Sequence, residues 1–158
     1  MFREIVRHKQ ALSREECIEL LKTERRGVLS VIGDDGYPYG LPINHYYHEE
    51  DGKLYFHSGK TGHKVDAFLR DPKASFCIYD SGTPQEGSWA LNFRSVIIFG
   101  RIEVVNDHQK AIDLCRRLSL CFTDDMDYID NEVDHFGAGV LVFSLTPEHI
   151  TGKRVNES

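Results

Sequence analysis

One ten-residue stretch, Tyr55 to Lys64, concentrates residue types that bind anions. It reads Tyr-Phe-His-Ser-Gly-Lys-Thr-Gly-His-Lys, so an apolar strand leads through a glycine-bearing loop into a helix. The loop and the helix start carry hydroxyls and cations at Ser58, Lys60, His63 and Lys64. Because a helix N-terminus has free backbone N–H groups and a partial positive charge, the stretch predicts a phosphate site. The open alternative is an ordinary strand-to-helix turn with solvated lysines.

The rest of the chain is acidic and has an ordinary globular composition. It has 158 residues, of which 41% are hydrophobic and 28% charged, and we expect a single domain over residues 1–158. The formal net charge of −6 argues against a nucleic acid or an anionic membrane as partner. The sequence contains no apolar run of signal-peptide or membrane-spanning length, so we expect a cytoplasmic protein.

Other groups of metal-ligating residue types favour structural roles. The four cysteines form no C-x-x-C pair, which favours reduced, mostly buried thiols over a disulfide framework or a zinc site. His45 and His48 precede the acidic residues 49–51, but residues three apart on a strand point to opposite faces. We therefore expect a solvated polar hairpin there. The acidic run at 124–134 lacks the glycine and ligand spacing of a calcium loop, and we expect it to be solvated or partner-facing, irregular or loosely helical.

Hydrophobic periodicity and turn residues predict a mainly antiparallel arrangement of strands with a few helices. Ser13 and Glu16 have the spacing of a capping box, which starts a helix that Gly27 ends. Strands are expected at 28–32, 37–48, 54–57, 74–79, 89–105 and 140–145, helices at 62–70 and 107–121, and a frayed tail at 152–158. Hairpins join the first three strands, which disfavours a doubly wound sheet, and closure into a small barrel removes exposed strand edges.

The strand expected at 37–48 has features that suit a planar ligand. Pro38 and Pro42 cannot donate ladder hydrogen bonds, so the strand must have a free edge, a bulge or both. Gly40 permits close approach of another group to the backbone. Simple protection of a strand edge is the alternative explanation for the prolines.

Three motifs occur in the order found in one family. They are Gly36–Asn44, then Leu54–Ser58 followed by Gly62–Lys64, then Arg94–Gly100. With the elements between them they resemble the FMN-binding split-barrel proteins, the pyridoxamine 5′-phosphate oxidase-like superfamily, and within it the nitroimidazole-resistance reductase-like branch. The resemblance covers residues 3–150. It implies a mainly β (α+β) fold, a six-stranded antiparallel split β-barrel with flanking helices, and a homodimer with FMN at the subunit interface.

The resemblance also implies which residues bind the cofactor. Backbone groups of the strand at 39–44 would contact the isoalloxazine ring, and the residues around the next strand end and helix start would hold the ribityl-phosphate. A polar position on a later strand contacts the flavin in many members from the other subunit. The implied set is Tyr39, Gly40, Leu41, Pro42, Asn44, His57, Ser58, Lys60, Gly62, His63, Lys64, Arg94 and Ser95.

Three residues of this region carry alternatives. His63 stands where the oxidase itself usually has arginine, and a histidine's charge near neutral pH depends on its surroundings. We therefore expect phosphate binding to weaken as the pH rises. For Arg94 the alternative role is a surface salt bridge. Trp89 is expected in the core or a subunit interface rather than stacked on a flavin.

The leading hypothesis is an FMN-dependent oxidoreductase, a reductase or oxidase, that acts on a small molecule. Nitro compounds are one substrate class that the resemblance implies. The chain has no Gly-x-Gly-x-x-Gly fingerprint, so NADH or NADPH would bind transiently as electron donor. No catalytic residue is assigned, although His57 is a candidate to face the site. The alternatives are a non-catalytic FMN-binding or storage protein, a haem-binding split barrel, and a deazaflavin in place of FMN.

Overall fold

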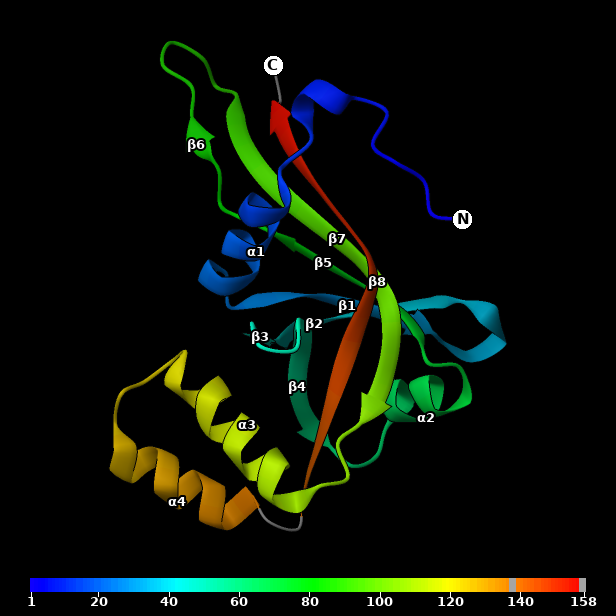
Figure 1. Ribbon diagram of the computed structural model, residues 1–158, viewed down its shortest axis with the longest axis vertical. Coiled ribbons are helices and arrows are strands. Elements are labelled where there is room, and N and C mark those ends of the chain that lie inside the picture. Colours follow the sequence, from blue (N-terminus) through cyan, green and yellow to red (C-terminus); the bar gives the residue numbers. More distant parts are fainter. Residues whose placement is uncertain (137–138, 157–158) are drawn as a thin grey trace.

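The computed structural model describes residues 1–136 and 139–156, and one antiparallel sheet dominates it (Figure 1). The strands are β1 Arg26–Ile32, β2 Pro38–Asn44, β3 Tyr46–His48, β4 Lys53–Gly59, β5 Lys73–Tyr79, β6 Thr83–Pro84, β7 Leu91–Val104 and β8 Val140–Asn156. The helices are α1 Arg14–Thr23, α2 His63–Arg70, α3 His108–Leu120 and α4 Met126–Phe136, with short 3-10 turns η1 His8–Gln10 and η2 Asp34–Gly36.

The order of the strands shows why the sheet curls. Neighbouring strands run β2-β1-β5-β7-β8-β4-β3, with β6 paired to β7. The two ends of this order, β2 and β3, are joined in the chain by the single residue His45. The sheet must therefore bend until its two edges meet, which produces a split barrel. The predicted fold class is confirmed; β6 is a short strand beyond the six that were expected, and β3 is the separated end of the strand expected at 37–48.

The core fills the inside of the curled sheet. Along β1, β5 and the later part of β7 buried and more exposed residues alternate, as the period of a strand requires. Among the fully buried side chains, Leu29, Phe76 and Ile98 come from these strands, and Phe56 and Phe143 come from β4 and β8. The helices α1 and α2 close the core with their apolar faces, which include Leu20, Leu21 and Phe68.

A second, smaller core lies under α3. Tyr55 of β4 and Val142 of β8 pack with Leu114 and Cys115 of α3. The Asp107 side chain caps α3 by accepting from the Lys110 N–H. The helix α4 lies beside α3 (Figure 1).

The acidic segment was expected to be irregular or loosely helical, and most of it forms a regular helix, α4. Ile129 and Val133 are buried, and they lie one helical turn apart. Their i, i+4 spacing is the apolar stripe that folds this segment against its neighbours.

The pairing of β7 with β8 extends much further than the sequence indicates. The expectation of a frayed tail is wrong for residues 152–156, because they continue β8 opposite β7 as far as Asn156. Residues 157–158 lie outside the described residues. The register shifts between Phe99 and Gly100. A Cβ atom at Gly100 would lie 2.2 Å from the Thr146 carbonyl oxygen, so only glycine fits this close approach of the two strands.

Several local expectations were also wrong. The first helix ends at Thr23, and Gly27 lies within β1, where a Cβ atom would be 2.5 Å from the Phe76 ring. The strand expected at 37–48 breaks at His45. Of the two places expected for Trp89, the core is wrong, because the residue is 82% exposed, and a subunit interface stays a prediction. The cysteines are all free thiols, as expected, and among the described residues no helix is long and apolar enough to cross a membrane.

Candidate functional site

The N-terminus of α2 has the properties of an anion site. Gly62 occupies the N-cap position with φ of 123°, and no side chain of the described residues caps the first N–H groups of the helix. A Cβ atom at Gly59 or Gly62 would meet nothing within 4 Å, so the approach is open. Lys60 is exposed and Lys64 half-buried, and within the described ranges neither forms an ion pair. An uncapped helix start with two unpaired lysines fits a phosphate group.

His63 is tied to the β1–β2 hairpin as well as to α2. Its ring stacks on Tyr39 with centroids 4.1 Å apart. The Asp34 backbone N–H donates to His63 Nε2 at 3.3 Å, and the Asp34 carboxylate lies 3.7 Å from the same atom. Both contacts engage Nε2 with the β1–β2 hairpin, so this atom of His63 points away from the open start of α2 only while Asp34 holds it.

Asp34 belongs to a small network that sequence reasoning missed. Arg70 at the end of α2 donates to the Asp34 carboxylate at 3.3 Å and to the Ile32 carbonyl at 3.2 Å. Asp34 appeared in the sequence only as part of a tight-turn signal, and nothing there indicated its contact with residues 29 and 36 positions away. The network joins both ends of α2 to the hairpin beside β2.

The strand β2 has the free edge that its prolines predict, because it is the end of the sheet order. Gly40 lies opposite Ser30 of β1, and a Cβ atom there would be 3.2 Å from Ser30 Oγ. Close packing on β1 is thus one reason for this glycine. The Asn44 side chain accepts from Arg26 Nε at 2.8 Å, so Asn44 is held by β1 at the end of the strand. Leu41 and Pro42, half-buried and exposed respectively, continue the strand between them.

The end of β4 brings two further predicted residues to opposite faces. Ser58 donates to the carbonyl of Gly59 at 2.8 Å. His57 is half-buried beside Leu114 and Cys115 of α3, and burial lowers its pKa, so it is neutral near pH 7. Successive residues of a strand point to opposite sides. Ser58, not His57, therefore shares the face of the phosphate loop in its present rotamer.

Arg94 and Ser95 lie apart from the other predicted residues. Arg94 donates through Nε to Asp80 at 2.9 Å and lies 3.7 Å from Glu19, so the predicted alternative of a salt bridge is confirmed. Burial raises the pKa of Asp80, but hydrogen bonds from Arg94 and Gly82 outweigh it and lower that pKa overall. Arg101 marks the part of β7 near the end of α2, because it pairs with Lys73, which follows that helix. The stretch from Arg94 to Arg101 spans about 23 Å of strand at roughly 3.3 Å per residue.

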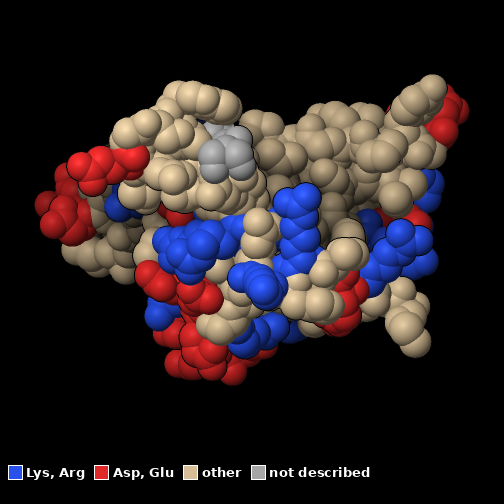
Figure 2. Space-filling view, turned by 90° about the horizontal axis from the view of Figure 1, so that it is seen from above, with Lys and Arg blue, Asp and Glu red and all other residues tan. Residues whose placement is uncertain are grey.

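The end of the molecule that carries Arg94 is locally basic. Arg94 lies directly opposite Arg154 on β8, and Ser95 lies opposite Lys153. Figure 2, viewed onto the end where β6 and the last residues of β8 lie, shows Lys and Arg side chains gathered near the centre. Glu16 accepts from Arg154 at 2.9 Å, so acidic groups of α1 offset part of this charge. A single copy of the chain thus keeps Arg94 and Ser95 away from the start of α2.

The expectation for His45 was wrong, because this residue is only 2% exposed. The chain bends at His45 between β2 and β3, so the alternation of a regular strand does not apply across it. His45 and His48 therefore line the same cavity. Among the described residues no group of three or more His, Cys, Asp and Glu side chains is placed to hold a metal ion.

A curled antiparallel sheet whose free edge strand lies beside a basic helix start defines a split-barrel protein with a candidate anion site. The family model described as pyridoxamine 5′-phosphate oxidase matches residues 13–154, and the chain belongs to this family. A comparison with functionally curated proteins finds no match.

Solved structures with the same fold are distant in sequence. A conserved hypothetical protein from Mycobacterium tuberculosis is 20% identical, with 96% of this chain and 90% of that chain covered and a TM-score of 0.81. A protein assigned to 5-nitroimidazole antibiotic resistance from Bacteroides thetaiotaomicron is 19% identical, with 92% and 87% covered and a TM-score of 0.75. The FAD binding protein from Mycobacterium smegmatis is 21% identical, with 94% and 99% covered and a TM-score of 0.68.

Proposed function

We propose that the protein binds a flavin, FMN, with its phosphate at the N-terminus of α2 and its ring along the free edge of β2. The observation that carries the proposal is the uncapped helix start with unpaired Lys60 and Lys64 beside that edge. Family membership and the flavin named for the Mycobacterium smegmatis neighbour support it. FMN ends in a single phosphate, which suits one compact site of this kind better than the longer diphosphate of FAD.

Purification of the protein with its native ligand tests this proposal. We expect a visible flavin spectrum, and a released ligand with the mass of FMN. A released ligand with the mass of FAD or of a deazaflavin would mean that the site binds that cofactor and not FMN. A Soret band without flavin absorption would contradict the proposal in favour of the haem-binding alternative.

We further propose an oxidoreductase that acts on a small molecule with NADH or NADPH as electron donor. When bound, FMN supplies the hydride and electron transfer chemistry. The chain holds the phosphate at Lys64 and the α2 N–H groups and presents backbone groups of β2 to the ring. His57 lies on the α3 side of β4, burial lowers its pKa so that it is neutral near pH 7, and it is not assigned a proton-transfer role.

Anaerobic reduction separates an enzyme from a storage protein. We expect NADH or NADPH to bleach the flavin absorption, and a nitroaromatic compound to restore it, because the Bacteroides thetaiotaomicron neighbour is assigned to nitroimidazole resistance. If dithionite bleaches the flavin but neither nicotinamide does, the protein is a flavin-binding module instead. If the flavin is bleached by a nicotinamide but not reoxidised by the nitro compound, the protein is an oxidoreductase with a different electron acceptor.

The flavin site is complete, we propose, only in a homodimer. The outer face of β5 and β7 exposes large apolar side chains, with Ile97 and Phe99 each 41% exposed and Tyr79 59% exposed. A hollow of about 450 Å³ on this face reaches from Phe99 across to Ser30 and Pro38 at the β1–β2 hairpin. A second copy packed on this face would bring its Arg94 and Ser95 toward the β2 edge of the first.

A further inference from the structure

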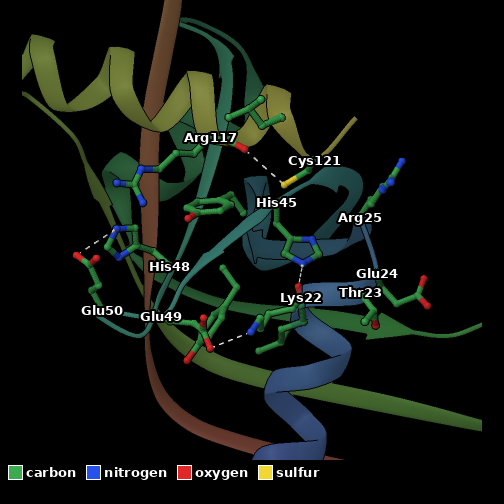
Figure 3. Close-up of a pocket in the computed structure, with 14 residues that line it drawn as sticks. Lys22, Thr23, Glu24, Arg25, His45, His48, Glu49, Glu50, Arg117 and Cys121 are labelled. Atoms are coloured by element: carbon green, nitrogen blue, oxygen red, sulfur yellow. Dashed lines mark hydrogen bonds and ion pairs between the residues drawn. The ribbon is translucent and has the colours of Figure 1, made fainter. Parts of the chain in front are cut away.

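A second cavity lies away from the proposed flavin site. It has a volume of about 520 Å³ and opens between the end of α1, the segment from His45 to Glu50, and the end of α3 (Figure 3). Its lining residues and the residues implied for the flavin are different sets. The cavity therefore calls for an explanation of its own.

His45 forms the floor of this cavity with a fixed orientation. Its Nε2 atom lies 2.7 Å from the Leu21 carbonyl oxygen, which can only accept, so Nε2 carries the hydrogen and caps the end of α1. The other ring nitrogen, Nδ1, is then a hydrogen-bond acceptor. It is buried, and it has no hydrogen-bond partner among residues 1–136 and 139–156. Burial lowers the pKa of His45, against the effect of the Leu21 hydrogen bond, so the ring stays neutral near pH 7.

A buried acceptor without a partner is costly to a folded protein. The T-shaped contact of the His45 ring with Phe76, at a centroid distance of 5.0 Å, fixes the plane of the ring. A half-turn of the ring would put a carbon where Nε2 now lies and break the hydrogen bond to Leu21, so Nδ1 is held in its present position. The arrangement favours a group with an N–H or O–H that enters the cavity and donates to Nδ1.

His48 provides a second oriented ring on the cavity wall. Its Nδ1 atom lies 3.3 Å from Asp51 Oδ1. The Asp51 carboxylate is itself held by the Tyr55 hydroxyl, at 2.5 Å, and by the Lys53 N–H, at 2.9 Å. The contact between His48 and Asp51 lacks the geometry of a hydrogen bond, because His48 Nδ1 has no hydrogen-bond partner among the described residues, and Nε2 lies 4.0 Å from Glu50. T-shaped contacts with the rings of Tyr46 and Tyr55, each at a centroid distance of 6.0 Å, orient the His48 ring.

Charges of both signs surround the mouth of the cavity. Lys22 and Glu49 pair with each other at 2.9 Å. Figure 3 shows Arg117 extending from α3 toward His48 and Glu50, and Arg25 with Glu24 on the other side, past His45. The nearby Tyr46 hydroxyl raises the pKa of Arg117. Neither arginine has a carboxylate within 4.0 Å among the described residues.

We propose that this cavity is a binding site for a small zwitterion, with an ammonium or other N–H donor at one end and a carboxylate or phosphate at the other. The donor end meets Nδ1 of His45, and the anionic end meets the guanidinium of Arg117. Glu24 at the mouth forms no ion pair among the described residues, and its carboxylate favours an ammonium over a second anion. The site is separate from the flavin site, and the proposal stands whether or not the protein binds FMN.

Binding of four small probes tests the chemistry of the ligand. Phosphoethanolamine and β-alanine carry both ends, ethanolamine lacks the anion, and inorganic phosphate lacks the donor. We expect at least one of the two zwitterions to bind by titration calorimetry, at least ten times more tightly than ethanolamine or phosphate. The zwitterion that binds more tightly shows whether the site prefers a phosphate or a carboxylate at the anionic end. No binding of either zwitterion, or equal binding of inorganic phosphate, would overturn the proposal.

The position of the bound probe is tested by ¹⁵N NMR of the histidine side chains and by paired variants. We expect the zwitterion to shift the Nδ1 resonance of His45. We expect Arg117→Gln to weaken its binding at least tenfold while flavin content stays unchanged. Arg116→Gln is the matched control, because Arg116 is the neighbouring arginine of α3 and pairs with Asp130. Equal weakening by both variants, or an unshifted His45 resonance, would show that the probe binds elsewhere.

Discussion

Two adjacent basic residues at the start of α2 have different surroundings, and this decides which of them can hold a phosphate. His63 is stacked on Tyr39 and accepts from the Asp34 N–H, whereas Lys64 forms no ion pair within the described part of the chain. Replacement of Lys64 by alanine removes a charge-assisted contact and should weaken FMN binding by about 1.5–3 kcal/mol. Fluorescence titration of the apoprotein at low salt measures this.

The controls for Lys64 are His63→Ala and Lys9→Ala. We expect a smaller loss for His63→Ala, because its ring is engaged with the hairpin, and no loss for the exposed Lys9 in η1. If Lys64→Ala binds FMN as tightly as the unmodified protein, the phosphate lies elsewhere. The sequence identified this basic pair, but not Asp34, because contacts between distant segments follow from the closed sheet.

Burial of His45 should make the stability of the protein depend on pH. The ordinary pKa of its side chain is 6.5, and burial lowers the pKa in the folded state. Below about pH 6.5 the unfolded chain therefore binds a proton that the folded chain does not, and the free energy of unfolding falls as the pH drops. Above this range the residue contributes no pH dependence. His57 acts in the same direction.

Urea unfolding between about pH 5 and 7.5 measures the contribution of His45. We expect His45→Gln to reduce the acid-side slope by up to one proton, which is about 1.4 kcal/mol per pH unit. A parallel His8→Gln variant changes an exposed histidine in η1 and should leave the slope as it is. Equal slopes in all three proteins would show that His45 is not neutral in the folded state.

At the level of elements, strand pairing explains both what the sequence predicted and what it missed. The strand at β1, the capped helix α3 and the free edge of β2 follow from local patterns, and all three are present. The second half of β8 is polar and contains Pro147, so its own sequence does not indicate a strand. It is a strand because β7 is long enough to pair with it as far as Asn156. Local patterns carry no information about the length of a distant partner.

The bulge at Gly100 should be the most sensitive point of this long ribbon. A methyl group there would have to displace the Thr146 carbonyl, which is part of the β8 backbone and not a flexible side chain. We expect Gly100→Ala to destabilise the fold by about 1–3 kcal/mol. The matched control is Gly59→Ala, where the added methyl group meets nothing within 4 Å. Equal unfolding midpoints of the two variants in urea would show that the ribbon shifts without cost.

At the scale of the whole molecule, the separation of the implied flavin residues is the main argument for a second subunit. Most of them lie on β2, at the end of β4 and at the start of α2. The sequence motifs predicted these three elements. Arg94 lies about 23 Å along β7 from Arg101, which pairs with Lys73 just after α2, at roughly 3.3 Å per residue. The sequence alone could not show this separation, because it depends on which part of the long β7 pairs with β5 near α2.

Substitution of Phe99 by aspartate tests the dimer and the flavin site together. Phe99 is 41% exposed on the apolar face of β7 and stacks with Phe2, at a centroid distance of 5.8 Å. A charge buried between two subunits is strongly unfavourable, so the variant should run as a monomer by light scattering where the unmodified protein is a dimer. Its flavin affinity should fall at least tenfold, because Arg94 and Ser95 of the other copy are lost. Tyr128→Asp, at a 54% exposed position on α4, should change neither property. A monomeric unmodified protein that retains FMN would refute the shared site, and a monomeric Phe99→Asp that binds FMN normally would confine the cofactor to residues of one chain.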